Sequence, residues 1–112
     1  MAEGLAAKTC TPCQGGIPPM PHARAAEMIA EAPGWELKDK GTRIERSFKF
    51  KDFAGAFDFV RKVADLAEEE FHHPDIRFGW GSCTVSLQTK KIKGLHENDF
   101  IMAAKINAFA PR

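Results

Sequence analysis

The chain has 112 residues, of which 44% are hydrophobic and 28% are charged, and its formal net charge is +1 at pH 7. This length predicts a single domain with one core, and the composition excludes a wholly disordered protein. The small net charge creates no overall field, so we expect neither nucleic acid nor a membrane as partner. Residues 1–8 contain no long apolar run that would indicate a signal peptide or anchor, and three cysteines suit free thiols. We therefore expect a cytoplasmic protein.

The N-terminal end combines an irregular composition with two cysteines. Because it is rich in proline and glycine, residues 1–20 are predicted to be an extension that packs as an ordered strap or frays, ahead of a domain over residues 21–112. Cys10 and Cys13 form a C-x-x-C pair, which raises a zinc or redox interpretation with His22 as a third ligand. Structural zinc normally takes four ligands and the chain has no second C-x-x-C, so we expect no metal.

Hydrophobic periodicity and turn residues predict seven elements in the remaining chain. In the order helix, strand, strand, helix, strand, strand and helix, they cover residues 22–31, 35–38, 42–50, 53–70, 76–80, 83–87 and 97–109. Pro21 precedes the first helix, and Asp52 is placed to cap the second. Arg46 interrupts the apolar face of the second strand. This order predicts an α+β fold, in which three helices pack on one face of a four-stranded antiparallel sheet.

The two long helices are both rich in apolar residues. In the helix over residues 53–70, apolar residues recur at three- and four-residue spacing and are expected to pack on the sheet. They are Phe53, Phe57, Val60, Ala64 and Ala67, with Ala56 and Val63 beside them. The helix over residues 97–109 has little polar surface, so it should be buried on more than one side. In so small a domain, burial of that extent predicts oligomerisation.

Two of the four histidines lie together where the second helix should end. His72 and His73 precede Pro74, and a helix usually ends at or before the residue that precedes a proline. Imidazole titrates near neutral pH, and a helix end facing a sheet edge is a common rim of a pocket. The glutamates at 68–70 oppose the helix dipole, a local conflict that can mark a functional site. A structural cap or a solvated turn is the alternative role for the histidine pair.

The stretch around the histidine pair carries a longer pattern. Its residues, in order, are Glu68, His72, His73, Pro74, Trp80, Lys90 and Asp99. Their spacing resembles the signature of the pterin-4a-carbinolamine dehydratases. The resemblance extends over most of the chain, including the aromatic second strand and the last helix.

The resemblance implies an α+β enzyme, assembled as a dimer or tetramer, that dehydrates 4a-hydroxytetrahydropterin without a metal or organic cofactor. Loss of water from C4a needs one proton delivered to the leaving hydroxyl and another removed from a ring nitrogen, and imidazole suits both transfers. By resemblance, His72 and His73 carry proton transfer or contact the substrate. The residues implied to orient groups around the pterin or to shape the walls of the site are Glu68, Pro74, Trp80 and Asp99.

One position departs from the family pattern. A third histidine is expected just after Thr89, where this chain has Lys90. A lysine is an ammonium group at neutral pH unless its surroundings lower the pKa, so as a catalytic residue Lys90 is a poor replacement for imidazole in proton transfer. Lys91 and Lys93 lie beside it, and we interpret the three lysines as a solvated basic cluster.

A dehydratase fold with an impaired catalytic set is similar to a second group, the pterin dehydratase-like Rubisco assembly factors of α-carboxysome-bearing bacteria. In that interpretation the protein is a chaperone, the sheet face and Lys90, Lys91 and Lys93 contact the Rubisco large subunit, and the histidine pair is an inherited relic. Lys90 favours this function over an active 4a-hydroxytetrahydrobiopterin dehydratase in pterin recycling. A binding role unrelated to Rubisco is a third interpretation, since animal relatives also dimerise with a transcription factor.

Overall fold

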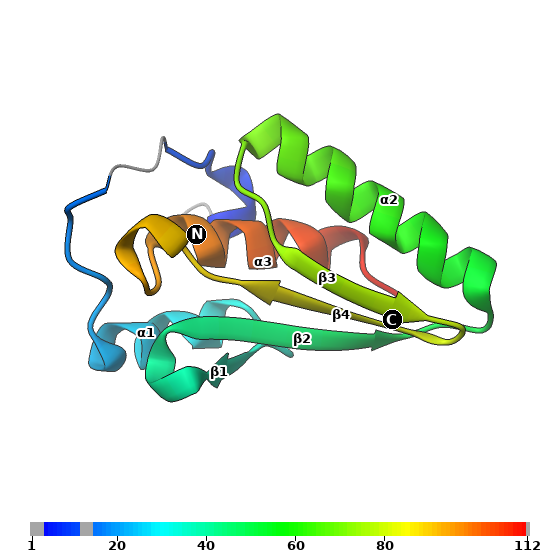
Figure 1. Cartoon of the computed structure of the whole chain (residues 1–112), viewed down its shortest axis with the longest axis horizontal. Helices are drawn as coiled ribbons and strands as arrows, with labels where there is room; N and C mark the ends of the chain where they lie inside the picture. Colours follow the sequence, from blue (N-terminus) through cyan, green and yellow to red (C-terminus); the bar gives the residue numbers. More distant parts are fainter. Residues whose placement is uncertain (1–3, 12–14, 112) are drawn as a thin grey trace.

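The computed structural model describes residues 4–11 and 15–111 (Figure 1). Its helices and strands follow the predicted order. They are α1 (His22–Met28), β1 (Glu36–Lys38), β2 (Arg43–Lys49), α2 (Phe53–Glu70), β3 (Asp75–Gly79), β4 (Ser82–Leu87) and α3 (Glu97–Phe109). Short 3-10 helices occupy Leu5–Ala7, Ile29–Glu31, Asp39–Gly41 and Lys90–Ile92. The predicted α+β fold is confirmed. None of the described helices is long and apolar enough to cross a membrane.

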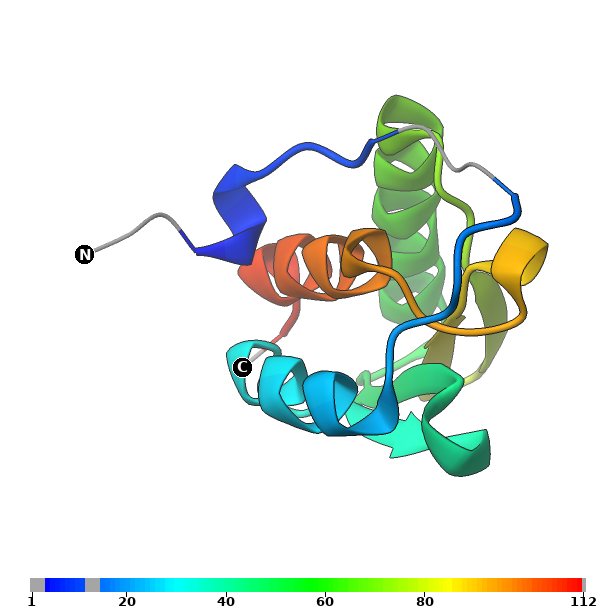
Figure 2. The ribbon, with the colours of Figure 1, turned by 90° about the vertical axis from the view of Figure 1, so that its left-hand side faces the viewer.

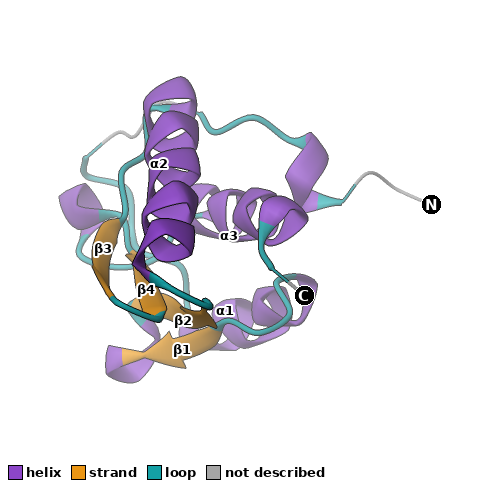
Figure 3. Cartoon of the chain, turned by 90° about the vertical axis from the view of Figure 1, so that its right-hand side faces the viewer, coloured by secondary structure: helices purple, strands orange, loops and turns teal. Residues whose placement is uncertain are grey.

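The four strands form one antiparallel sheet in the order β1-β2-β4-β3. The register pairs Ile44 with Leu87 and Phe48 with Cys83, so these four buried side chains share one face. The helices lie on this face, and the core fills the space between them and the sheet (Figure 3). The side chains between the apolar positions, which are mostly polar, point to the opposite face.

Arg46 interrupts the inner face, as the sequence indicated. Its Nη1 donates to Asn107 Oδ1 of α3 at 2.5 Å, and its guanidinium carbon lies 4.5 Å from the centre of the Phe48 ring. Asn107 Oδ1 also accepts from Trp35 Nε1 at 2.9 Å. The guanidinium thus has a polar and an aromatic partner at the rim of the core, and it links the sheet to the last helix.

α2 packs through a different stripe from the one expected. Its buried residues are Ala56, Phe59, Val63 and Ala67. Phe53 and Phe57 are instead 47% and 53% exposed, and their rings lie 5.3 and 6.3 Å from that of Phe78 on the edge strand β3. Val60 is only partly buried and Ala64 is exposed, so the prediction was wrong for these outer positions. The helix has two neighbouring apolar stripes, and residue spacing does not show which of them faces the sheet.

α3 is buried by other parts of the same chain. Its fully buried apolar residues are Phe100, Ile101, Met102, Ala103 and Ile106. The sheet and α2 cover part of its surface, and the segment over residues 4–11 crosses it on another side, with Leu5 in the core (Figure 2). Burial on more than one side is therefore confirmed. It gives no argument for oligomerisation, because the N-terminal segment provides the cover.

Candidate functional site

A pocket of about 420 Å³ opens between the end of α2 and the turn that follows β4. It is lined by Phe71, His72, His73, Gln88, Thr89, Lys90 and Lys91. The histidine pair and two lysines of the basic cluster, which lie 17 or more positions apart in the sequence, therefore meet at one surface. The volume lies within the range typical of sites for small molecules.

The end of α2 directs the two histidines to different environments. Phe71 caps the helix in the left-handed conformation, with φ 52° and ψ 45°, and the backbone N–H of His72 donates to Ala67 O at 3.2 Å. The chain then leaves the helix, so that His72 is 7% exposed whereas His73 lies at the surface. A large residue in this conformation is uncommon and strained, and Phe71 is also 82% exposed.

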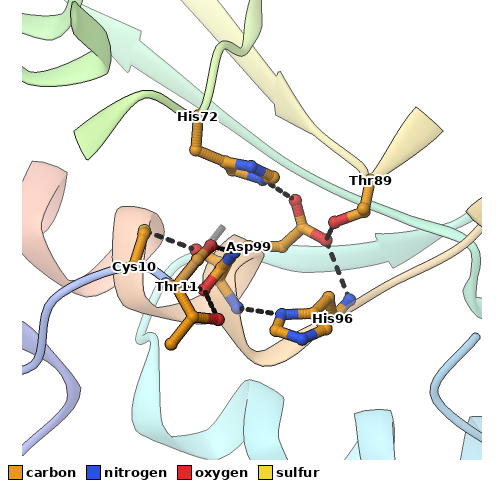
Figure 4. A network of polar contacts seen from close by, with 7 residues as sticks. Cys10, Thr11, His72, Thr89, His96 and Asp99 are labelled. Atoms are coloured by element: carbon orange, nitrogen blue, oxygen red, sulfur yellow. Dashed lines mark hydrogen bonds and ion pairs between the residues drawn. The ribbon is translucent and has the colours of Figure 1, made fainter. Parts of the chain in front are cut away.

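His72 forms the buried part of the site with Asp99. Its Nε2 lies 2.7 Å from Asp99 Oδ1, and the Asp99 side chain is fully buried. The second carboxylate oxygen of Asp99 accepts from Thr89 Oγ1 at 2.8 Å and from the backbone N–H of His96 at 3.0 Å (Figure 4). These hydrogen bonds fix the carboxylate, and the carboxylate fixes the orientation and the tautomer of the imidazole.

Asp99 also belongs to the cap of α3. His96 is the N-cap residue, and its Nδ1 accepts from the backbone N–H of Asn98 at 3.0 Å. Together with the bond from the His96 N–H to Asp99, this forms a capping box. The start of α3 and the buried histidine are therefore held by the same carboxylate.

The exposed part of the site contains a histidine–glutamate hydrogen bond and a lysine–aspartate ion pair. His73 Nε2 lies 2.6 Å from Glu68 Oε2, and Lys90 Nζ lies 3.3 Å from Asp75 Oδ1. The side chains of both pairs are about half or more exposed, so the pairs contribute little to stability. Lys91 and Lys93 are exposed on the same turn as Lys90.

The structure does not bring every predicted site residue to the pocket. Pro74 links His73 to β3 and is not part of the lining. Trp80 lies in the β3–β4 turn and is 71% exposed. At roughly 3.3 Å per residue along a strand, this turn is separated from the pocket by the whole length of β3. The placement gives no support to Trp80 as a wall of this pocket within one chain.

Three residues of the lining, Phe71, Gln88 and Thr89, were not predicted as site residues from the sequence. Thr89 is 3% exposed, and its hydroxyl donates to Asp99. In the sequence, its position directly before the basic cluster was only a weak indication of a site residue. Phe71 lines the pocket at a helix end, where glycine or asparagine is usual. A large aromatic residue between a helix and an X-Pro pair was the signal that could have identified it.

The cysteines show no metal site in the part of the chain that the structure describes. Within residues 4–11 and 15–111, no group of three His, Cys, Asp or Glu residues is placed to hold a metal ion. Cys13 lies outside the described residues. Burial, followed by the nearby Glu70 carboxylate, raises the pKa of the Cys10 thiol to about 12. Cys83 is buried, as the sequence predicted, and burial raises its pKa to about 11.

The raised pKa of Cys10 predicts a loss of stability at alkaline pH. The folded protein holds this proton more tightly than the unfolded chain, in which the pKa is near the ordinary value of 9.0. The contribution is therefore complete below about pH 9 and is lost as the pH rises toward 12. Melting temperatures measured by circular dichroism between pH 8 and 11 should fall more steeply for wild type than for Cys10→Ser. Equal slopes would contradict the prediction.

The sequence was compared with known protein families and with individual proteins. Residues 18–109 match the sequence profile described as Pterin 4 alpha carbinolamine dehydratase. A protein of Cupriavidus pinatubonensis whose name assigns it to the pterin-4-alpha-carbinolamine dehydratases is 58% identical over 110 residues, which cover 98% of this chain and 95% of the relative. A protein of Methylococcus capsulatus with the same assignment is 58% identical over 109 residues, covering 97% and 96% of the two chains.

Solved structures extend the comparison. A transcriptional coactivator/pterin dehydratase from Brucella melitensis has a TM-score of 0.78 at 36% identity, covering 83% of this chain and 99% of that chain. A pterin dehydratase-like protein identified as a RuBisCO assembly factor in the alpha-carboxysome has a TM-score of 0.58 at 26% identity, covering 67% and 87%. The profile match and the identity to full-length relatives agree, and the chain belongs to the pterin-4a-carbinolamine dehydratase family.

Proposed function

We propose that the protein is an active 4a-hydroxytetrahydropterin dehydratase that serves pterin recycling. The observation that carries this proposal is the position of His72, which lines a pocket of about 420 Å³ and lies 2.7 Å from the fully buried Asp99 carboxylate behind it. Asp99 has two further donors, so the imidazole is held in one orientation before any substrate binds.

The reaction requires two proton transfers at neighbouring atoms. The C4a–O bond breaks as the hydroxyl takes up a proton and leaves as water, and the ring nitrogen loses its proton as a double bond forms to C4a. In the proposed mechanism, His72 performs one transfer from its fixed position. His73, exposed at the rim beside Glu68, performs the other and exchanges protons with solvent. Both steps lie within the chemistry of imidazole, so the proposal calls for no cofactor.

Lys90 contacts the substrate in this proposal without carrying a proton between atoms. It lines the same pocket, and its ammonium group is held near Asp75. An ammonium group donates hydrogen bonds to a carbonyl or a hydroxyl, both of which the pterin substrate offers. The departure from the family pattern thus changes a contact at the rim and leaves the buried pair in place.

The direct test is the rate at which purified protein dehydrates the 4a-carbinolamine, generated in place by an aromatic amino-acid hydroxylase. Wild type should form the dihydropterin product faster than buffer alone, and Lys90→His should change its rate by less than about tenfold. If wild type is no faster than buffer and Lys90→His gains activity, the pocket is an inherited relic and the proposal is wrong.

Rubisco assembly is a second candidate, supported by the likeness to the assembly factor and by the exposed cluster of Lys90, Lys91 and Lys93. We rank it below the dehydratase because the assembly factor is 26% identical, against 36% for the Brucella protein. Size-exclusion chromatography with a Rubisco large subunit from an α-carboxysome operon tests it. Wild type should form a stable complex with the large subunit. The triple variant Lys90→Glu, Lys91→Glu, Lys93→Glu should form none while its melting temperature stays that of wild type, and this result would favour the assembly function.

We propose that the protein is a homo-oligomer, a dimer or tetramer, which associates through the exposed stripe of α2. The family is generally oligomeric. Phe53 and Phe57 leave about half of their surface in water beside Phe78, and such an apolar patch is typical of a protein–protein interface. Light scattering at micromolar concentration should give at least twice the monomer mass. Phe57→Glu should lower the mass to that of a monomer, while Lys91→Glu, which places a glutamate on the surface away from α2, should not.

A further inference from the structure

The N-terminal segment over residues 4–11, named the strap here, lies across the two helices that carry the buried pair. It passes over α3 and reaches the C-terminal end of α2, as Figure 2 shows in blue. Leu5 is 5% exposed and belongs to the core, so the strap is a packed part of the fold. The dehydratase family profile covers residues 18–109, whereas the alignments with the two bacterial relatives cover 97–98% of this chain and so extend over the strap.

Asn98 binds the strap through both ends of its amide. Its Nδ2 donates to the backbone carbonyl of Thr11 at 2.7 Å, and its Oδ1 accepts from the backbone N–H of Thr11 at 3.0 Å (Figure 4). One side chain thus pairs with both backbone groups of one residue, as a neighbouring strand would. Asn98 is 1% exposed, and a buried amide needs such partners. This polar side chain in the first turn of α3 is explained by the strap.

Glu70 holds the strap against α2. The backbone N–H of Cys10 donates to Glu70 Oε1 at 2.7 Å. Lys105 of α3 lies 3.7 Å from Glu70 Oε2 and donates to the Ala6 carbonyl at 3.0 Å. The Glu70 side chain is only 6% exposed. These contacts join the strap, the end of α2 and the body of α3 in one partly buried cluster.

Both anchors are close neighbours in sequence of the buried pair. Asn98 immediately precedes Asp99, and Glu70 ends α2 two residues before His72. His72 and Asp99 belong to different elements and are 27 positions apart, so their 2.7 Å contact depends on how the end of α2 sits against the start of α3. Hydrogen bonds weaken steeply when the distance or the angle departs from the optimum. A segment that is hydrogen-bonded to both helix ends therefore affects the distance between His72 Nε2 and Asp99 Oδ1.

We propose that the strap is a positioning element for the His72–Asp99 pair, which it holds in register by binding Asn98 on α3 and Glu70 on α2. The consequence for catalysis rests on the proposed dehydratase function. The consequence for the geometry of the pair does not. The strap residues themselves are positioning residues and touch no reacting atom.

Thr11→Pro tests the proposal, because proline removes both the backbone N–H and the hydroxyl that donate to Asn98 Oδ1, while the exposed Thr11 side chain contributes nothing to the core. Thr9→Pro is the matched control. Thr9 is exposed, its N–H bonds to no described residue, and Lys8 before it has φ −86° and ψ 161°, which suit a following proline. If Thr11→Pro does not fold, Cys10→Pro removes the bond to Glu70 in its place.

Two readouts are needed, and the first does not depend on activity. In proton NMR, the ring proton that His72 Nε2 shares with Asp99 should resonate far downfield in wild type. It should move upfield or broaden in Thr11→Pro and stay in place in Thr9→Pro. In the dehydration assay, kcat of Thr11→Pro should fall at least about fivefold with KM within about twofold, because a small misplacement of a reacting group lowers the rate strongly.

The outcomes separate this proposal from the proposed function. If wild type shows no dehydratase activity but the His72 resonance moves in Thr11→Pro alone, the strap positions the pair and only the enzymatic role is lost. If the resonance of Thr11→Pro matches that of wild type, the strap is not a positioning element, whatever happens to kcat. An equal change in Thr9→Pro also overturns the proposal, since it would show a general effect of disturbing the segment.

Discussion

Replacing His72 by alanine should lower kcat for carbinolamine dehydration by about 10²–10⁴-fold, the range expected for loss of one proton-transfer group. His72 lines the pocket, and its Nε2 lies 2.7 Å from the buried Asp99 carboxylate, which holds the imidazole in place. Alanine removes the group that exchanges the proton and leaves the rest of the lining in place. KM should change much less than kcat, because His73, Lys90 and the other rim residues still contact the substrate.

Two controls make this prediction specific. His72→Gln keeps a polar side chain beside Asp99 but cannot exchange a proton near neutral pH, so its kcat should be as low as that of His72→Ala. His22 is exposed at the start of α1, outside the pocket lining, and His22→Ala should retain wild-type kcat. Circular dichroism confirms that each variant is folded. A folded His72→Ala with kcat within threefold of wild type would remove His72 from the mechanism.

The sequence predicted the order of elements well because the signals for strands and turns are local. Alternation in β2 and β4 and the turn at Asp39–Gly41 come from neighbouring residues. The residues of α2 do not show by themselves which face of the helix is buried. Two adjacent stripes are apolar, and contact with the sheet decides which of them packs in the core. Burial of α3 was predicted correctly, but its cause was not, because the strap that covers it has no hydrophobic period of its own.

The site was predictable in part for the same reason. His72 and His73 were found from the residue pattern before Pro74, whereas the contact between His72 and Asp99 joins two elements and follows from no local spacing. Two of the three glutamates that oppose the dipole of α2 have partners that only the folded chain supplies. Glu68 pairs with His73, and Glu70 bonds to the strap.

Asp99→Ala should have the largest effect on stability of any change in the site, about 3–5 kcal/mol, because it removes one partner of a buried polar network. The carboxylate is fully buried. It is the hydrogen-bond partner of the His72 ring, the Thr89 hydroxyl and the backbone N–H of His96. All three lose their acceptor at once, and the capping box of α3 is lost with them. Urea unfolding measures the loss. Thr89→Val, which deletes one hydroxyl of the network, should cost only about 1 kcal/mol.

Asp99→Asn separates the structural role of this residue from its catalytic role. The amide oxygen can still accept from Thr89 and His96, and the amide nitrogen then faces His72 Nε2, which must become an acceptor. That exchange puts the imidazole in the other tautomer, so unfolding should cost about 1 kcal/mol while kcat falls by about 10²-fold or more. Nitrogen chemical shifts of His72 report the tautomer directly. Wild-type kcat with the altered tautomer would show that Asp99 stabilises the fold without directing the chemistry.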